Sequence, residues 1–264
     1  MHRSTSWSSA WALSSAVRPS RTVVTEEAHP SAIARLLEEI SWEGNARRYR
    51  DGGRGRENVL TTEVFGALDL LPRTAFLGGV LRAAYGADPA RLAIAESVEE
   101  ADVHVLPGDV APTWTDATST RWTVQPDATI SSATTLCFVE AKRLRSASFQ
   151  RSQLARTLLA LHHAAAGRTS LLLLVLATAP PVAVARLGRL SIEQAIDIGL
   201  EDFPRLDADA VRPLVATSVT WITWDEIAAV TADAVDTLGQ LPDSVRSSLV
   251  RLSHTVITAI DWHR

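Results

Sequence analysis

The chain has 264 residues, of which 46% are hydrophobic, so it can bury a sizeable core and is not a wholly disordered chain. Its formal net charge of −4 gives no overall signal for nucleic-acid binding, and its single cysteine excludes an internal disulfide and a cysteine-rich metal site. No apolar run reaches the roughly 18 residues of a membrane-spanning helix, and the first 20 residues lack the apolar centre of a secretion signal. We therefore expect no membrane association and a cytoplasmic location.

The N-terminal part is expected to precede the core. Residues 1–28 are rich in serine and small residues, which predicts a flexible segment. Ser31 suits the cap of a helix that continues to Ile40. Residues 51–55 read DGGRG and predict a mobile basic loop, because no Gly-Lys-Ser/Thr follows as in a phosphate-binding loop. Residues 29–264 are expected to form a single domain.

Helical periodicity predicts the next three elements. The first helix extends from Asn58 to Leu71, and two further helices are predicted over Ala75–Tyr85 and Pro89–Ser97. Asp102–Leu106 then alternates polar and apolar residues, as in a strand. The first helix should turn a stripe of apolar residues toward the core, namely Leu60, Val64, Leu68 and Leu71.

The centre of the chain predicts a hairpin, a helix and a buried strand. Two short strand-like runs lie in residues 121–141 and can pair through residues 131–133. Cys137 lies in the second run, so we interpret it as a small core residue. Ser148–Ala166 has helical periodicity. Ser170–Ala177 reads SLLLLVLA, a continuous apolar run typical of a strand buried on both faces.

Residues 178–264 are interpreted as an accessory part, which follows a core at about residues 58–177. We expect packing anchors rather than base-stacking platforms at Trp221, Trp224 and Trp262. The predicted elements are a helix from Ser191 to Leu200, a strand over Leu214–Trp221, a helix from Glu226 to Leu238, and a closing helix over Asp243–Ile260.

Three polar side chains in the predicted hairpin indicate an active site. Because side chains alternate along a strand, Glu140 and Lys142 share one face. Burying such charges is costly unless they are paired or bind a metal. The hairpin can bring Asp127 beside Glu140, and a divalent cation would relieve the repulsion between the two carboxylates. Their hard oxygen atoms suit Mg²⁺, with Mn²⁺ as a substitute, better than Zn²⁺.

The choice of lysine at position 142 supports this interpretation. The chain has 26 basic residues, and Lys142 is the only lysine among them. Lysine is a compact point charge, whereas arginine is a wide planar fork that does not readily release its proton. A position that orients or deprotonates water, or stabilises a developing oxyanion, could therefore require lysine.

The motif resembles that of the PD-(D/E)XK nuclease superfamily. Pro126-Asp127 matches the PD, Glu140-Ala141-Lys142 matches the ExK, and Gln153 resembles a glutamine that many of these nucleases carry on the next helix. The resemblance covers roughly residues 58–177. It implies an α/β fold with a restriction-endonuclease-like αβββαβ core, in which helices flank a mixed central sheet, with helical additions at both ends.

The resemblance also implies roles for these residues. Asp127 and Glu140 would bind Mg²⁺, Lys142 would position the attacking water, and Gln153 would belong to the catalytic set. An acidic residue on the first core helix often completes such sites as a metal ligand and catalytic residue. Glu63 is the candidate for that position and Glu57 the second choice, although a glutamate near a helix start is also simply favourable with the helix dipole.

Arginines near the motif could contact phosphates even in an acidic protein. We expect nucleic-acid contacts from two arginines before the first core helix and two after the lysine, namely Arg54, Arg56, Arg143 and Arg145. Scattered arginines are, however, also common on ordinary solvated surfaces.

These observations predict a Mg²⁺-dependent endonuclease or exonuclease that hydrolyses phosphodiester bonds, with DNA preferred over RNA. The resemblance suggests bacterial restriction, repair or phage defence, and a homodimer or a partner protein is compatible with it. One alternative is a catalytically inactive module of the nuclease fold that binds nucleic acid or a protein. Another is an unrelated α/β protein in which the motif is accidental.

Overall fold

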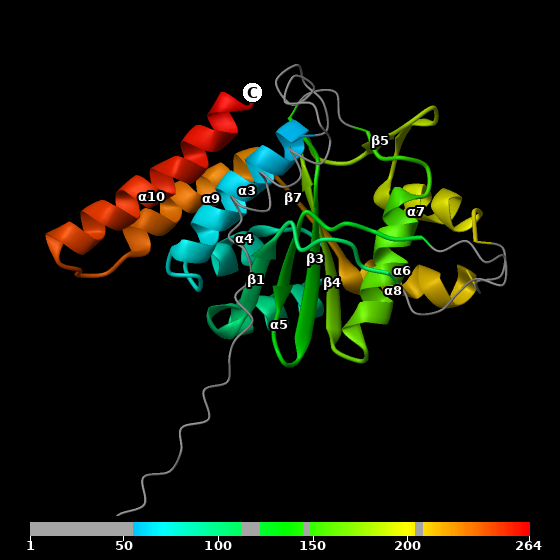
Figure 1. Ribbon diagram of the computed structural model, residues 1–264, viewed down its shortest axis with the longest axis horizontal. Coiled ribbons are helices and arrows are strands. Elements are labelled where there is room, and N and C mark those ends of the chain that lie inside the picture. The colour runs from blue at the N-terminus through cyan, green and yellow to red at the C-terminus, as the bar shows by residue number, and fades with distance from the viewer. Residues whose placement is uncertain (1–54, 112–121, 145–147, 204–207) are drawn as a thin grey trace, which may run out of the picture. The chain divides into compact units, whose positions relative to one another are not determined.

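The structure is a computed structural model that describes residues 55–111, 122–144, 148–203 and 208–264 (Figure 1). For residues 55–57 it describes the backbone alone. The predicted flexible segment 1–28, the helix from Ser31 to Ile40 and residues 51–54 of the basic loop lie outside the described residues. None of the helices in the described ranges combines the length and apolarity needed to cross a membrane.

A five-stranded mixed sheet forms the centre of the described chain, in the order β1-β2-β3-β4-β7. Antiparallel pairing joins β1 to β2 and β2 to β3, whereas β3, β4 and β7 are parallel neighbours. Parallel neighbours need a crossover, and α6 supplies the one between β3 and β4. The strands are β1 (Asp102–Val105), β2 (Ala128–Ser131), β3 (Thr135–Ala141), β4 (Thr169–Leu176) and β7 (Val219–Thr223).

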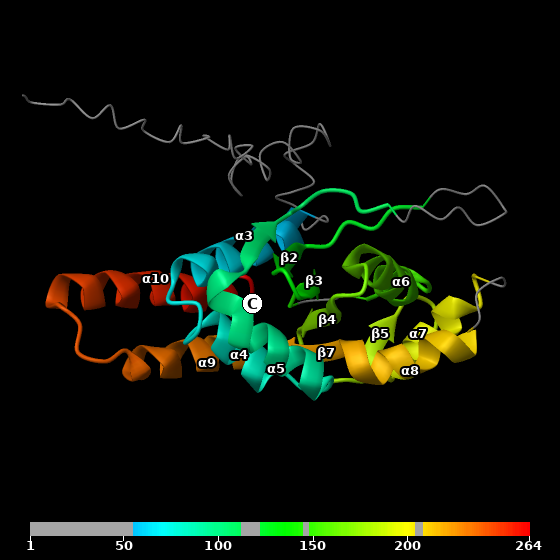
Figure 2. The same ribbon diagram turned by 90° about the horizontal axis from the view of Figure 1, so that it is seen from below.

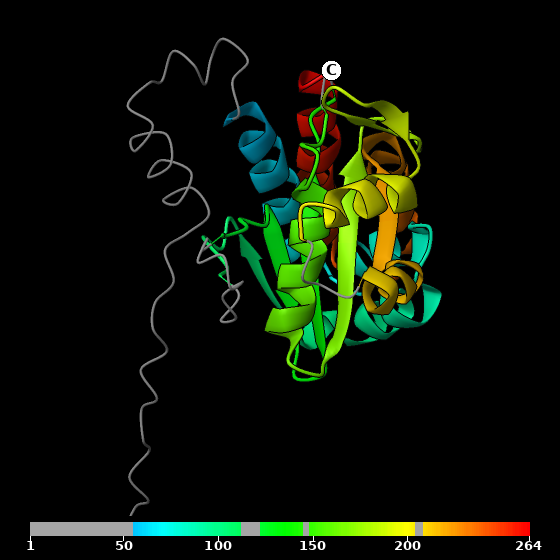
Figure 3. The ribbon, with the colours of Figure 1, turned by 90° about the vertical axis from the view of Figure 1, so that its right-hand side faces the viewer.

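Helices cover both faces of this sheet (Figures 2 and 3). On one side of the sheet lie α3 (Gly55–Leu70), α4 (Leu77–Ala83), α5 (Asp88–Ser97) and α9 (Trp224–Thr237), and α10 (Asp243–Trp262) packs on α3 and α9. The other side packs against α6 (Gln153–Ala165), α7 (Ile192–Leu200) and α8 (Ala208–Ser218). Alternate residues of β3 and β4 supply the two cores, so both strands are buried on both faces. A short 3-10 helix, η1 (Val98–Glu100), leads into β1.

The predicted hairpin and central strand are confirmed. Ala128 pairs with Val139 and Ser131 with Leu136, so the turn lies at residues 132–134. Seven of the eight residues of β4 are buried, which agrees with the apolar run SLLLLVLA. The apolar stripe predicted for the first helix is also in the core, where its four residues are at most 2% exposed, although the last of them, Leu71, directly follows α3. Up to residue 177 the described chain contains α3, α4 and α5, then β1, β2 and β3, and then α6 and β4.

Two element boundaries were predicted wrongly. Leu214–Ser218 is the end of helix α8 rather than strand, because Val211, Val215 and Ser218 face the core at helical spacing. The strand begins only at Val219. Helix α6 begins at Gln153 rather than at Ser148.

The late start of α6 has a tertiary cause. The amide of Phe149 donates to the carbonyl of Ala183 at 2.9 Å, and its carbonyl accepts from the amide of Ala185 at 2.8 Å. Phe149 thus pairs with β5 (Val182–Val184), which forms a two-stranded hairpin with β6 (Gly188–Leu190). These hydrogen bonds hold Phe149 in extended conformation and prevent an earlier helix start.

The three tryptophans predicted to be packing anchors differ in environment. Trp224 is fully buried, as predicted. Trp221 is half-buried and stacks on Tyr85, with 4.4 Å between the ring centroids. Trp262 is 73% exposed, so its prediction as an anchor is wrong. Its position near the end of α10 places the indole on the solvent side of the helix, away from the core positions Val256, Ala259 and Ile260.

The buried thiol of Cys137 gives a first testable prediction. Burial raises the pKa of the Cys137 thiol to about 12, and the thiolate is the reactive form. We expect the native chain not to react with Ellman's reagent at pH 8, whereas the chain unfolded in guanidinium chloride should release one equivalent of chromophore. Rapid stoichiometric labelling of the native chain would contradict the burial of Cys137 in β3.

Candidate active site

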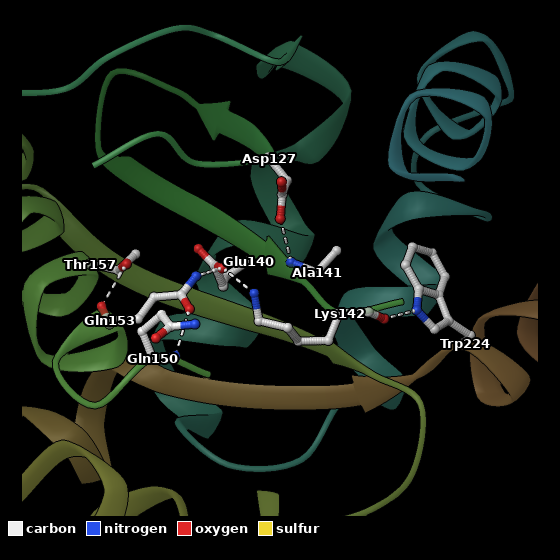
Figure 4. A network of polar contacts seen from close by, with 8 residues as sticks. All are labelled: Asp127, Glu140, Ala141, Lys142, Gln150, Gln153, Thr157 and Trp224. Atoms are coloured by element: carbon white, nitrogen blue, oxygen red, sulfur yellow. Dashed lines mark hydrogen bonds and ion pairs between the residues drawn. The ribbon is translucent and has the colours of Figure 1, made fainter. Parts of the chain in front are cut away.

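An acid and the only lysine of the chain meet where β3 ends (Figure 4). Glu140 is 5% exposed and Lys142 is 9% exposed. The Lys142 Nζ atom lies 2.9 Å from Oε1 of Glu140, so the ammonium points toward the carboxylate, as the shared strand face predicts. Such a buried pair is stable only when further polar groups complete it.

Asp127 is attached to the same end of β3 by its own contacts. Its amide donates to the carbonyl of Val139 at 3.0 Å, and its Oδ2 atom accepts from the amide of Ala141 at 2.7 Å. These two partners are the residues immediately before and after Glu140. On its other side, the Asp127 carbonyl accepts from the amide of Leu106 at 2.8 Å. The hairpin therefore brings Asp127 to the strand end that carries Glu140 and Lys142.

Gln153 completes the environment of Glu140. It is the first residue of α6, and its Nε2 donates to Oε1 of Glu140. Its Oε1 atom accepts from the amide of Gln150 at 3.2 Å, which orients the side-chain amide with the nitrogen toward the acid. Both donors to Glu140 bind the same oxygen, so within the described part of the chain its Oε2 atom has no hydrogen-bond donor. That oxygen could coordinate a cation.

Three further residues hold Lys142 in place. The Lys142 amide donates to the carbonyl of Val175 in β4 at 2.8 Å, and its carbonyl accepts from Nε1 of Trp224 at 2.7 Å. The ammonium also lies 4.8 Å from the centre of the Phe149 ring, within the range of a cation–π interaction. Sequence reasoning did not assign Phe149 or Trp224 to the site. No local signal could have found Trp224, which lies 82 positions after Lys142.

The third predicted acid has a different contact. Oε2 of Glu63 lies 3.8 Å from Nε2 of His263 at the end of α10, and burial raises the pKa of the Glu63 carboxyl. Within the described ranges, no three histidine, cysteine or acidic side chains form a group that could hold a metal ion. The role of Glu63 stays a prediction, as does that of Glu57, whose side chain lies outside the described residues.

The arginines predicted to bind nucleic acid are only partly described. Arg54, Arg145 and the side chain of Arg56 lie outside the described residues, while Arg143 is half-buried just after the lysine. Arg151 forms ion pairs with Glu201 and Asp202, which reduce its attraction for phosphate. Arg156, one turn after Gln153, has a buried Nε atom without a hydrogen-bond partner within the described chain.

The site combines two carboxylates, an ammonium and an amide donor. Mg²⁺ is commonly held in proteins by one or two carboxylates together with waters and substrate phosphates. Asp127 and Glu140 meet that requirement, because both lie at one strand end and Oε2 of Glu140 has no donor among the described residues. The ammonium of Lys142 could donate to a water or to a phosphate oxygen. The residues therefore fit a Mg²⁺ site for reactions at phosphate.

The buried ion pair leads to a stability prediction. Replacing Lys142 by methionine leaves the Glu140 charge without its cation, and breaking such a buried pair typically costs about 3–5 kcal/mol of unfolding free energy. In urea denaturation, the double variant Glu140→Gln/Lys142→Met should lose less than the sum of the two single losses. The exposed pair of Arg212 and Asp197 is the control, since Arg212→Met should shift the midpoint far less. Additive losses would contradict the interaction between Glu140 and Lys142.

Comparison with known proteins does not assign a family. No protein-family model matches the chain, and neither a curated protein nor a solved structure matches it.

Proposed function

We propose that the chain is a Mg²⁺-dependent nuclease that hydrolyses phosphodiester bonds, with DNA as the preferred substrate. The observation that carries the proposal is the convergence on Glu140: Lys142 and Gln153 both donate to one of its oxygens, and Asp127 is hydrogen-bonded to the next residue of the strand. A carboxylate pair for a hard cation next to a single ammonium is the chemistry that phosphoryl transfer needs.

The order of elements also supports the proposal. A helical part precedes three antiparallel strands, a crossover helix and a fourth strand parallel to the third. This is the αβββαβ order that the resemblance to the PD-(D/E)XK superfamily implies. Asp127 directly precedes β2, Glu140 lies in β3 and Gln153 is the first residue of the crossover helix α6, an arrangement that is compatible with the resemblance.

The residues can be given separate tasks in hydrolysis. When bound, Mg²⁺ supplies Lewis-acid polarisation of a phosphate oxygen and lowers the pKa of a bound water. Asp127 and Glu140 hold the cation, and Gln153 keeps the Glu140 carboxylate oriented through its amide nitrogen. Lys142 donates to the attacking water or to the charged phosphate oxygen, and Glu140 and the Phe149 ring keep its ammonium at that place.

A second candidate is a catalytically inactive module of the same fold that binds nucleic acid or a protein. The contact of Glu63 with His263 favours this candidate. Among the described residues, no third acid joins Asp127 and Glu140 in a group that could hold a metal ion. This candidate predicts binding that does not change when metal is chelated. The nuclease proposal also includes action in the cytoplasm, in restriction, repair or phage defence, and assembly as a homodimer or with a partner protein.

Cleavage assays test the nuclease proposal directly. Wild-type protein should cut linear or circular DNA in Mg²⁺ or Mn²⁺ and should stop cutting in EDTA. Lys142→Ala and Asp127→Ala should each lower the cleavage rate about 100-fold or more, because each removes a group that acts on the developing charge or on the cation. RNA is assayed in parallel to test the preference for DNA.

Asp233→Asn is the matched control, since this acid lies exposed on α9 and should leave the rate unchanged. Circular dichroism should show that each variant is folded. Cleavage by folded Lys142→Ala and Asp127→Ala at the wild-type rate would contradict the mechanism. Metal-independent binding without cleavage by the wild type would favour the inactive module.

A further inference from the structure

The β5–β6 hairpin is directly connected to the candidate active site through Phe149. The ring of Phe149 lies under the ammonium of Lys142, and the main chain of Phe149 pairs with Val184 of β5. The amide of Ala185, the first residue after β5, donates to the Phe149 carbonyl. The tip of the hairpin, residues 185–187, therefore starts next to the residue that supports the lysine.

The hairpin carries two arginines, Arg186 at its tip and Arg189 in β6. Arg186 and Arg189 are both exposed, and neither forms an ion pair with a residue of the described ranges. Arg189 donates only to the hydroxyl of Thr178, at 3.4 Å. No aspartate or glutamate occurs between Ala177 and Ile192. This differs from Arg151 at the same site, which is paired with two acids.

The backbone of the tip adds a second observation. Arg186 has a φ of 67°, in the left-handed region where glycine or asparagine is adopted at lower cost than other residues. Three-residue hairpin loops commonly have glycine at their left-handed position. An arginine held there is not explained by the turn itself, and unfavourable backbone conformations of this kind cluster at binding and catalytic sites.

We infer that the β5–β6 hairpin is part of the substrate site and binds the phosphodiester backbone of DNA through Arg186 at its tip and Arg189 in β6. The inference rests on the proposed nuclease function, and it extends that function to a binding element outside the motif. The two carboxylates repel a polyanionic substrate, so arginines on an adjoining element supply the attraction that brings phosphates to Lys142. Guanidinium groups suit this task because they bind phosphate through two parallel hydrogen bonds.

DNA-binding titrations test the inference. Fluorescein-labelled single-stranded and duplex DNA of mixed sequence are titrated with protein in Ca²⁺ instead of Mg²⁺, and anisotropy gives Kd over a range of salt concentrations. The double variant Arg186→Asn/Arg189→Gln should bind about tenfold or more weakly, since two phosphate contacts are lost. The slope of log K against log salt should become shallower by about 1.4 to 1.8. Arg251→Gln, which changes an exposed arginine of α10, is the control and should bind as the wild type does.

A stability measurement separates this role from a structural one. Asparagine adopts the left-handed conformation more readily than arginine, so Arg186→Asn should unfold at the same or a higher urea concentration while binding DNA more weakly. A double variant with the affinity and salt slope of the wild type would overturn the inference. Binding that weakens as expected in a protein that does not cut DNA would support the hairpin and refute the nuclease. A wild-type protein that binds neither DNA would refute both.

Discussion

The buried carboxylate of Glu140 is the constraint on which the rest of the site depends. A charge that is 5% exposed, at the end of an apolar strand, is stable only with donors close by. The ammonium comes from Lys142, which directly follows β3, and the amide comes from the first residue of α6. The first turn of α6 must therefore lie against the end of β3. This contact places the crossover helix beside the hairpin that carries Asp127.

The part of the chain after the core also contributes to the site. Trp224, at the start of α9, binds the carbonyl of Lys142, and the β5–β6 hairpin holds Phe149 under the ammonium. Both elements come from residues 178–264, which the sequence indicated as accessory. Fixing a flexible lysine side chain costs conformational entropy, and these contacts offset that cost by favouring one position of the ammonium. The segment is thus part of what positions the lysine.

The site shows which features can be read locally. Alternation along a strand was sufficient to predict that Glu140 and Lys142 face the same way, and the helical stripe of α3 followed from periodicity. The interior position of β4 followed from its continuous apolar run. The strand predicted over Leu214–Trp221 failed because its apolar and β-branched residues satisfy both periods over a short window. There the buried positions of α8 decided for helix as far as Ser218.

The sequence by itself determined the local elements and the set of polar residues at the end of β3, because the periods of strands and helices and the cost of burying charge act over a few residues. Only the tertiary structure decided that Gln153 and Lys142 share one oxygen of Glu140, that Trp224 binds the Lys142 carbonyl, and that Phe149 pairs with β5 instead of joining α6. The contacts of Gln153 with Glu140, of Trp224 with Lys142 and of Phe149 with Val184 join residues 13, 82 and 35 positions apart. No local pattern encodes them, since each depends on which elements the packed core brings together.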